Sequence, residues 1–129
     1  MVNTRRKGMS AERGAVKELE KDGWLVYRVK GSTPFNRNVD LFNLFDIFCI
    51  KNVGYVNAGR SNRVLIFRKY IQVKHQKPPL REFIEFKKNY CSPRDDVEIW
   101  IKERGRFEKI KINNEFMNNW DKKEEKEVR

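Results

Sequence analysis

Residues 44–50 read Leu-Phe-Asp-Ile-Phe-Cys-Ile and are apolar at every position but one. Successive side chains of a β-strand point to opposite faces of its sheet, so an apolar pattern without alternation buries both faces. Such a strand must lie inside a sheet that is covered on its two sides. We therefore expect a central strand here, and a fold in which helices pack on a sheet.

The rest of the chain supplies the other layers. Residues 10–22 predict a helix, with Ser10 as its N-cap and Gly23 as the residue that ends it. A second helix is expected after Pro78 and Pro79, and a frayed third one over residues 113–129. Strands are predicted at 24–29, 64–74, 97–102 and 107–112, with a loop at 31–34 and a loop or open hairpin at 51–63. This order, α-β-β-β-α-β-β, predicts an α/β protein with a mixed β-sheet flanked by helices.

With 129 residues the chain is expected to form one domain, residues 1–129, with a charged tail at about 121–129. No apolar run approaches the roughly 20 residues of a membrane span. The basic N-terminus lacks the apolar run of a secretory signal, and Cys49 and Cys91 are too few for a disulfide framework. We therefore expect a protein of the cytoplasm.

The charge is strongly unbalanced, with 29 Lys and Arg against 18 Asp and Glu, a net charge of +11. Such an excess favours a polyanionic partner, most often nucleic acid. The residues expected to contact the DNA backbone are Arg5, Arg6, Lys7, Arg60, Arg63 and Lys77. The alternative for these residues is an ordinary solvated surface.

Polar residues interrupt the apolar strands at two places. Asp46 stands in the predicted central strand, where an isolated buried carboxylate costs several kcal/mol unless a cation or donors compensate it. Gln72 and Lys74 share one face of the third strand, and Asp46 on a neighbouring strand is their obvious partner. The alternatives for Asp46 are a core Asp paired for structural reasons or one that lies at the end of the strand. The alternative for Gln72 and Lys74 is a half-exposed edge strand with polar residues facing water.

A third polar residue, Glu12, falls on the apolar side of the first predicted helix with Ala15, Val16 and Leu19. It could equally complement the helix dipole from the first turn. Taken together, oxygen ligands from Glu12, Asp46 and Gln72 suit a hard cation, and Lys74 suits the positioning of the attacking water or the neutralisation of developing charge. This combination describes a metal-dependent phosphodiesterase.

Three segments carry a resemblance to a known family: Arg6-Lys7-Gly8-Met9-Ser10-Ala11-Glu12-Arg13, Phe45-Asp46-Ile47 and Ile71-Gln72-Val73-Lys74. Together they resemble the PD-(D/E)XK nucleases, and within that superfamily the archaeal-type Holliday-junction resolvases and their small viral relatives. The resemblance implies a restriction-endonuclease-like fold and a Mg²⁺- or Mn²⁺-dependent DNA endonuclease, working in recombination or repair as a homodimer on branched or duplex DNA.

The resemblance also implies residue roles. Asp46 matches the shared metal ligand, Gln72 the second acidic position and Lys74 the motif lysine, while Glu12 matches the glutamate of the first helix. Ser32 matches a loop serine of the resolvases. The sequence departs from the pattern at Gln72, which brings no charge, and in its long interval from Asp46 to Gln72, which predicts an inserted hairpin.

Two other functions stay open. One is a non-catalytic nucleic-acid-binding module on a degenerate nuclease fold, of which Gln72 would be the sign. The other is a structural subunit recruited by its charged tail. Cleavage of DNA in the presence of a divalent cation separates the first reading from both.

Overall fold

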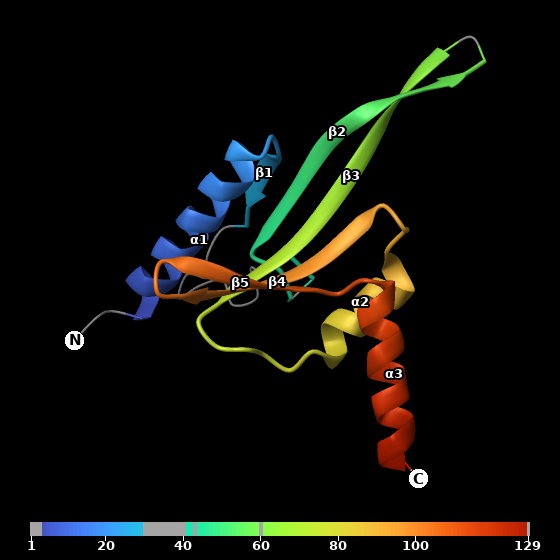
Figure 1. The fold of residues 1–129 in the computed structure, drawn as a ribbon. Coiled ribbons are helices and arrows are strands. Elements are labelled where there is room, and N and C mark those ends of the chain that lie inside the picture. The colour runs from blue at the N-terminus through green and yellow to red at the C-terminus, as the bar shows by residue number, and fades with distance from the viewer. Residues whose placement is uncertain (1–3, 30–40, 43, 60, 129) are drawn as a thin grey trace.

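The computed structural model describes residues 4–29, 41–42, 44–59 and 61–128. The elements follow in the order α1 (Thr4–Lys21), β1 (Leu25–Arg28), β2 (Ile47–Ala58), β3 (Ser61–Lys74), α2 (Arg81–Tyr90), β4 (Asp95–Glu103), β5 (Arg106–Lys111) and α3 (Asn114–Val128). The strands form one sheet in the order β1-β2-β3-β4-β5 (Figure 1). Only β3 and β4 pair in parallel. The expectation of an α/β protein with a mixed sheet is confirmed.

Each face of the sheet has its own apolar core. On one face, α1 packs its small and apolar side chains, among them Ala15 and Leu19, over Ile47 and Ile71 of the central strands. On the other face, α2 and the start of α3 cover Phe45 and those residues of β4 that point to this side of the sheet, such as Ile99. Both β2 and β3 are therefore interior strands, as the apolar pattern of residues 44–50 requires.

The ends of the first helix differ in how well the sequence predicts them. Helix α1 begins at Thr4, so the prediction of Ser10 as N-cap is wrong, and this exposed serine lies inside the helix. The preceding Arg, Lys and Met side chains favour helix and extend it beyond the capping signal. At the other end, Gly23 adopts a φ of 90°, and its backbone N–H donates to the Glu20 carbonyl at 3.0 Å, so Gly23 ends the helix as predicted.

The predicted second strand starts too early and stops too soon. Residues 44–46 form a bent approach to β2, which follows a turn at Phe42 with a φ of 55° and a bridge between Leu41 and Phe45. At the other end, β2 continues to Ala58, so the loop alternative for residues 51–63 is wrong and the hairpin alternative is confirmed. A ribbon that is exposed on both faces does not need alternating apolar residues, so this segment lacks the pattern by which strands are recognised. Its Gly and Asn residues therefore suggested turns.

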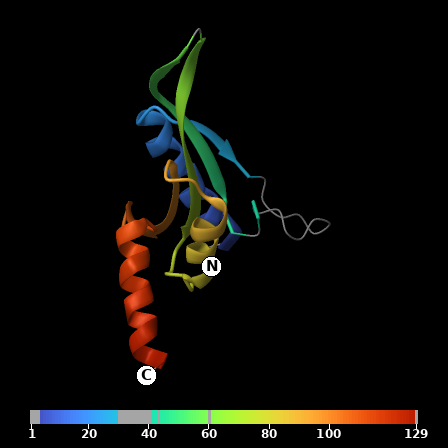
Figure 2. The same cartoon turned by 90° about the vertical axis from the view of Figure 1, so that its right-hand side faces the viewer.

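Most of this hairpin leaves the sheet. β1 pairs with β2 only as far as Ile50, and β4 pairs with β3 only from Arg68. Residues 51–67, which we call the arm, thus contain a two-stranded ribbon of residues 51–58 and 61–67, which projects from the rest of the fold in both views (Figures 1 and 2). A bulge between Asn52 and Gly54 shifts its register. The arm is a hairpin and accounts for most of the long interval between Asp46 and Gln72.

The C-terminal third closes the second face. A tight turn with positive φ at both Arg104 and Gly105 joins β4 to β5. Helix α3 packs Met117 into the core, its Asp121 pairs with Lys88 of α2 at 2.8 Å, and its far end extends away from the sheet opposite the arm (Figure 2). No helix in the described part of the chain is both long and apolar enough to span a bilayer.

Candidate functional site

Asp46 sits just before β2, fixed between the neighbouring strands. Its backbone N–H donates to the Ile71 carbonyl at 3.0 Å, and its own carbonyl accepts from the Val29 N–H at 2.9 Å. The carboxylate oxygen Oδ2 accepts a third bond, from the backbone N–H of Val73 at 2.9 Å. These bonds hold the Asp46 carboxylate against the end of β3, where the sequence places the other polar residues.

Gln72 and Lys74 lie beside this carboxylate. The pairing of Ile47 with Ile71 sets Asp46 next to Gln72 across the two strands. Ile71 and Val73 turn under α1, so Gln72 and Lys74 belong to the face covered by α2. Gln72 is 6% exposed, whereas Lys74 is exposed where β3 ends. Because β3 is the third of five strands, the edge-strand alternative for these residues is wrong.

Glu12 reaches the same end of the sheet from α1. Its Oε2 lies 2.8 Å from Nε of Arg28, with 21% of the glutamate side chain and 32% of the arginine side chain exposed. Arg28 pairs in register with Ile47, which follows Asp46 directly. The helix-dipole alternative for Glu12 is wrong, because the helix begins two turns earlier, at Thr4. Arg28 therefore shares the α1 face with Ile47 and balances the charge of Glu12 there, so the structure does not bring Glu12 onto the face that carries Gln72 and Lys74.

The donors at this end of the sheet suit a hard cation. Asp46 and Gln72 offer carboxylate and amide oxygens from adjacent strand positions, and Mg²⁺ commonly takes one or two protein ligands and keeps several waters. Among the described residues, no group of three or more His, Cys, Asp or Glu side chains is placed to hold a metal ion. The donor set that fits is therefore a sparse one: Asp46 and Gln72, with Glu12 engaged by Arg28.

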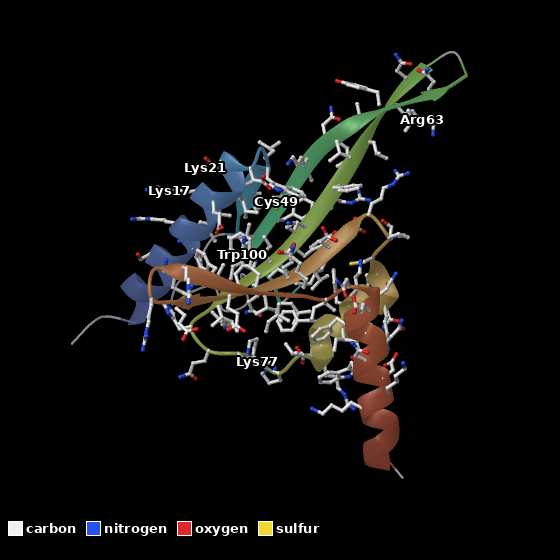
Figure 3. The ribbon with its side chains drawn as sticks, viewed as in Figure 1. Lys17, Lys21, Cys49, Arg63, Lys77 and Trp100 are labelled. Carbon is white, nitrogen blue, oxygen red and sulfur yellow. The ribbon has the colours of Figure 1, made fainter. Side chains whose placement is uncertain are left out.

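The other predicted site residues are spread widely. Ser32 and Arg60 lie outside the described residues, and Arg5, Arg6 and Lys7 fall in the first turns of α1, where side chains are not described. Arg63 is exposed near the far end of the arm, and Lys77 is exposed in the segment between β3 and α2 (Figure 3). The predicted basic residues therefore do not all gather at the Asp46 position.

A buried polar cluster beneath α1 escaped the sequence analysis. Glu98 of β4 is 2% exposed; its Oε2 lies 2.8 Å from Nζ of Lys69, and its Oε1 accepts from the Trp100 indole N–H at 3.0 Å. The Lys69 ammonium also lies 4.6 Å from the ring centre of Trp24. A tryptophan two residues after Glu98, on the same face of the strand, was the signal that this face is buried rather than wet.

The two cysteines are poor nucleophiles. Burial raises the pKa of Cys49 to about 12, against a smaller opposing effect of Lys69. Burial also raises the pKa of Cys91 to about 11. Both thiols are free and stay protonated near neutral pH, which argues against thiol catalysis.

Comparisons of this chain with known protein families, curated proteins and solved structures found no match.

Proposed function

We propose that this protein is a metal-dependent DNA endonuclease of the PD-(D/E)XK type, which hydrolyses phosphodiester bonds in duplex or branched DNA. The observation that carries the proposal is the placement of Asp46 at the start of one central strand, beside Gln72 and Lys74 at the end of the next. That arrangement joins a carboxylate that backbone hydrogen bonds fix just before β2 with a neutral oxygen donor and an exposed lysine on the interior strand β3. Rigid strands position such groups better than loops do.

In this proposal Asp46 and Gln72 hold Mg²⁺ or Mn²⁺. The ion would polarise the phosphate and lower the pKa of a bound water. Lys74, exposed two residues from Gln72 on the same face, positions the water or neutralises charge that develops on the phosphate. Glu12 lies on the α1 face with Arg28, opposite Gln72, so it would serve as a third oxygen ligand only by leaving Arg28 and reaching around the end of the sheet.

Charge supports DNA as the substrate. The chain carries a net charge of +11, and residues 47–74 contain six cations, Lys51, Arg60, Arg63, Arg68, Lys69 and Lys74, without a single Asp or Glu. Phosphate contacts from such residues fix a protein on nucleic acid without reading its sequence. The proposal includes a homodimer, because two symmetric cuts in a four-way junction need two sites, and a cytoplasmic location.

The test is a cleavage assay with junction, duplex and single-stranded DNA, with Mg²⁺, Mn²⁺ or EDTA. Asp46→Asn keeps an oxygen that can accept from the Val73 N–H but removes the charge, so it separates catalysis from folding. We expect Asp46→Asn and Lys74→Ala each to lower the cleavage rate about 100-fold or more, with DNA affinity little changed. Glu108→Gln, which neutralises an exposed carboxylate on β5, serves as the matched control. Folded variants that cut at the wild-type rate would refute the proposal.

A second candidate, a non-catalytic DNA-binding module, is favoured by two observations. Gln72 supplies no charge, and Glu12 is already paired with Arg28. Salt-sensitive DNA binding without cleavage in either metal would select this candidate. Failure to bind DNA at low salt would reject both and leave the structural-subunit reading.

A further inference from the structure

The arm, residues 51–67, contains none of the residues that take part in the proposed cleavage chemistry. Its strands pair from Lys51 with Phe67 to Ala58 with Ser61, about 25 Å at roughly 3.3 Å per residue. Isolated two-stranded ribbons are marginally stable in water. Apolar side chains nevertheless stay exposed on it, with Tyr55 at 72%, Val56 at 48% and Val64 at 48%. A projecting ribbon with exposed apolar groups on both faces indicates a binding element.

Pairing sorts the arm's side chains into two faces. Tyr55 lies opposite Val64, and Asn57 lies opposite Asn62, so these four share one face. Val56 lies opposite Arg63 on the other face. Asn57, Asn62 and Arg63 are all exposed, and Arg63 lies near the outer end (Figure 3). Amide, arginine and apolar groups are the side chains that contact base edges in DNA.

The charge of the arm selects its partner. Its ionisable Lys and Arg residues are Lys51, Arg60 and Arg63, and it contains no Asp or Glu. An all-cationic ribbon is repelled by a second copy of itself and attracted by phosphates.

Its width selects the groove. Two strands lie about 4.8 Å apart, so with side chains the ribbon is roughly 10 Å across. The major groove of B-form DNA is about 12 Å wide and admits a two-stranded ribbon, whereas the minor groove is only about 6 Å wide. The major groove of A-form RNA is deep and too narrow to enter.

We propose that the arm inserts into the major groove of B-form DNA, with Asn57 and Asn62 facing the base edges and Arg63, on the opposite face, contacting a flanking phosphate. This inference rests on the DNA substrate of the proposed function and not on cleavage. The bulge at Asn52 and Gly54 adds local twist, which helps a ribbon to follow a helical groove.

The experiment measures binding of Asp46→Asn protein to a 30-base-pair duplex at several salt concentrations. We expect Asn57→Ala with Asn62→Ala to weaken duplex binding about tenfold, and Arg63→Ala to lower the salt slope by about one. Binding to double-stranded RNA should not change. Arg106→Ala, which removes an exposed arginine from β5, is the matched control for Arg63→Ala and should leave duplex binding unchanged if the arm supplies these contacts.

Methylation interference then identifies the groove. Methyl groups on guanine N7, in the major groove, should block binding of the arm-intact protein and not of the arm variants, while methyl groups on adenine N3, in the minor groove, should have no such effect. Equal binding by all variants, interference at adenine N3 alone, or a change in oligomeric state without a change in DNA affinity would each overturn the inference. A wild-type protein that never cuts but shows guanine N7 interference would refute the nuclease and leave the arm's role standing.

Discussion

The buried pair of Lys69 and Glu98 gives a sharp test of how this sheet is held together. We consider Glu98→Gln, which preserves the side-chain shape and an oxygen for the Trp100 indole N–H but removes the charge facing Lys69. The two side chains are 14% and 3% exposed, so water can do little to replace the lost partner. Breaking a buried pair from one side costs about 3–5 kcal/mol, because the remaining charge is left uncompensated.

The expected change is large enough for simple thermal unfolding. Unfolding entropy of about 2.1 cal/mol/K per residue makes each kcal/mol worth roughly 4 °C in a chain of this length, so Glu98→Gln should lower Tm by roughly 10–20 °C.

The control is a pair of similar length at the surface. Glu18 and Lys109 lie 3.1 Å apart with 48% and 33% of their side chains exposed, and Glu18→Gln should cost less than about 1 kcal/mol. Adding Lys69→Met to Glu98→Gln should restore most of the stability, since no charge is then left buried. If Glu98→Gln cost no more than Glu18→Gln, the account of a desolvated pair beneath α1 would be wrong.

Three further outcomes are expected. Gln72→Glu should lower the Mg²⁺ concentration that gives half-maximal cleavage, since it adds a charge beside Asp46; an unchanged requirement would count against Gln72 as a ligand. In iodoacetamide labelling at pH 8, the folded protein should protect both thiols, Cys49 more than Cys91. The free energy of unfolding should fall as pH rises from about 9 towards 12. The pKa values in the folded protein are raised to about 12 for Cys49 and about 11 for Cys91, so the thiols of the unfolded chain ionise first. Burial alone would raise the pKa of Asp95, but hydrogen bonds from Arg68 and Ser92 outweigh it and leave the pKa below its ordinary value, so stability should be lost as pH falls through that lowered pKa. In urea unfolding between pH 5 and pH 2, Asp95→Asn should flatten this loss.

The fold was predictable where burial dictates sequence. The apolar residues around Ile47 and Ile71 can only belong to strands covered on both faces, and they lie in β2 and β3. Gly23 was equally readable, since a left-handed residue after a helix favours glycine. The start of α1 was not, because a run of basic residues with good helix propensity carries no amphipathic signal.

The site was predictable only in part, and for the same physical reason. Gln72 stands out as a polar residue in an apolar strand, and Asp46 as the one polar residue in the run 44–50. The pairing of Ile47 with Ile71 then places them next to each other. The pairing of Arg28 with Glu12 could not be predicted from the sequence. The two residues are 16 positions apart, and their contact depends on how α1 packs against β1. The strands of the arm were hard to predict, because a ribbon exposed to solvent on both faces does not need the alternation of apolar and polar residues on which strand prediction depends.

The borders of the sheet bear on how this protein behaves in concentrated solution. β1, at one border, is only four residues long, while β5, at the other, carries Arg106, Glu108, Lys109 and Lys111. Short or charged borders discourage pairing between molecules. The two outer strand edges of the arm are neither short nor lined with as many charges. Only the repulsion between the cationic arms of two molecules keeps these edges apart, and salt weakens it, because the screening length falls to about 3 Å near 1 M. We expect light scattering to rise with ionic strength, as copies begin to stack strand against strand along their arms.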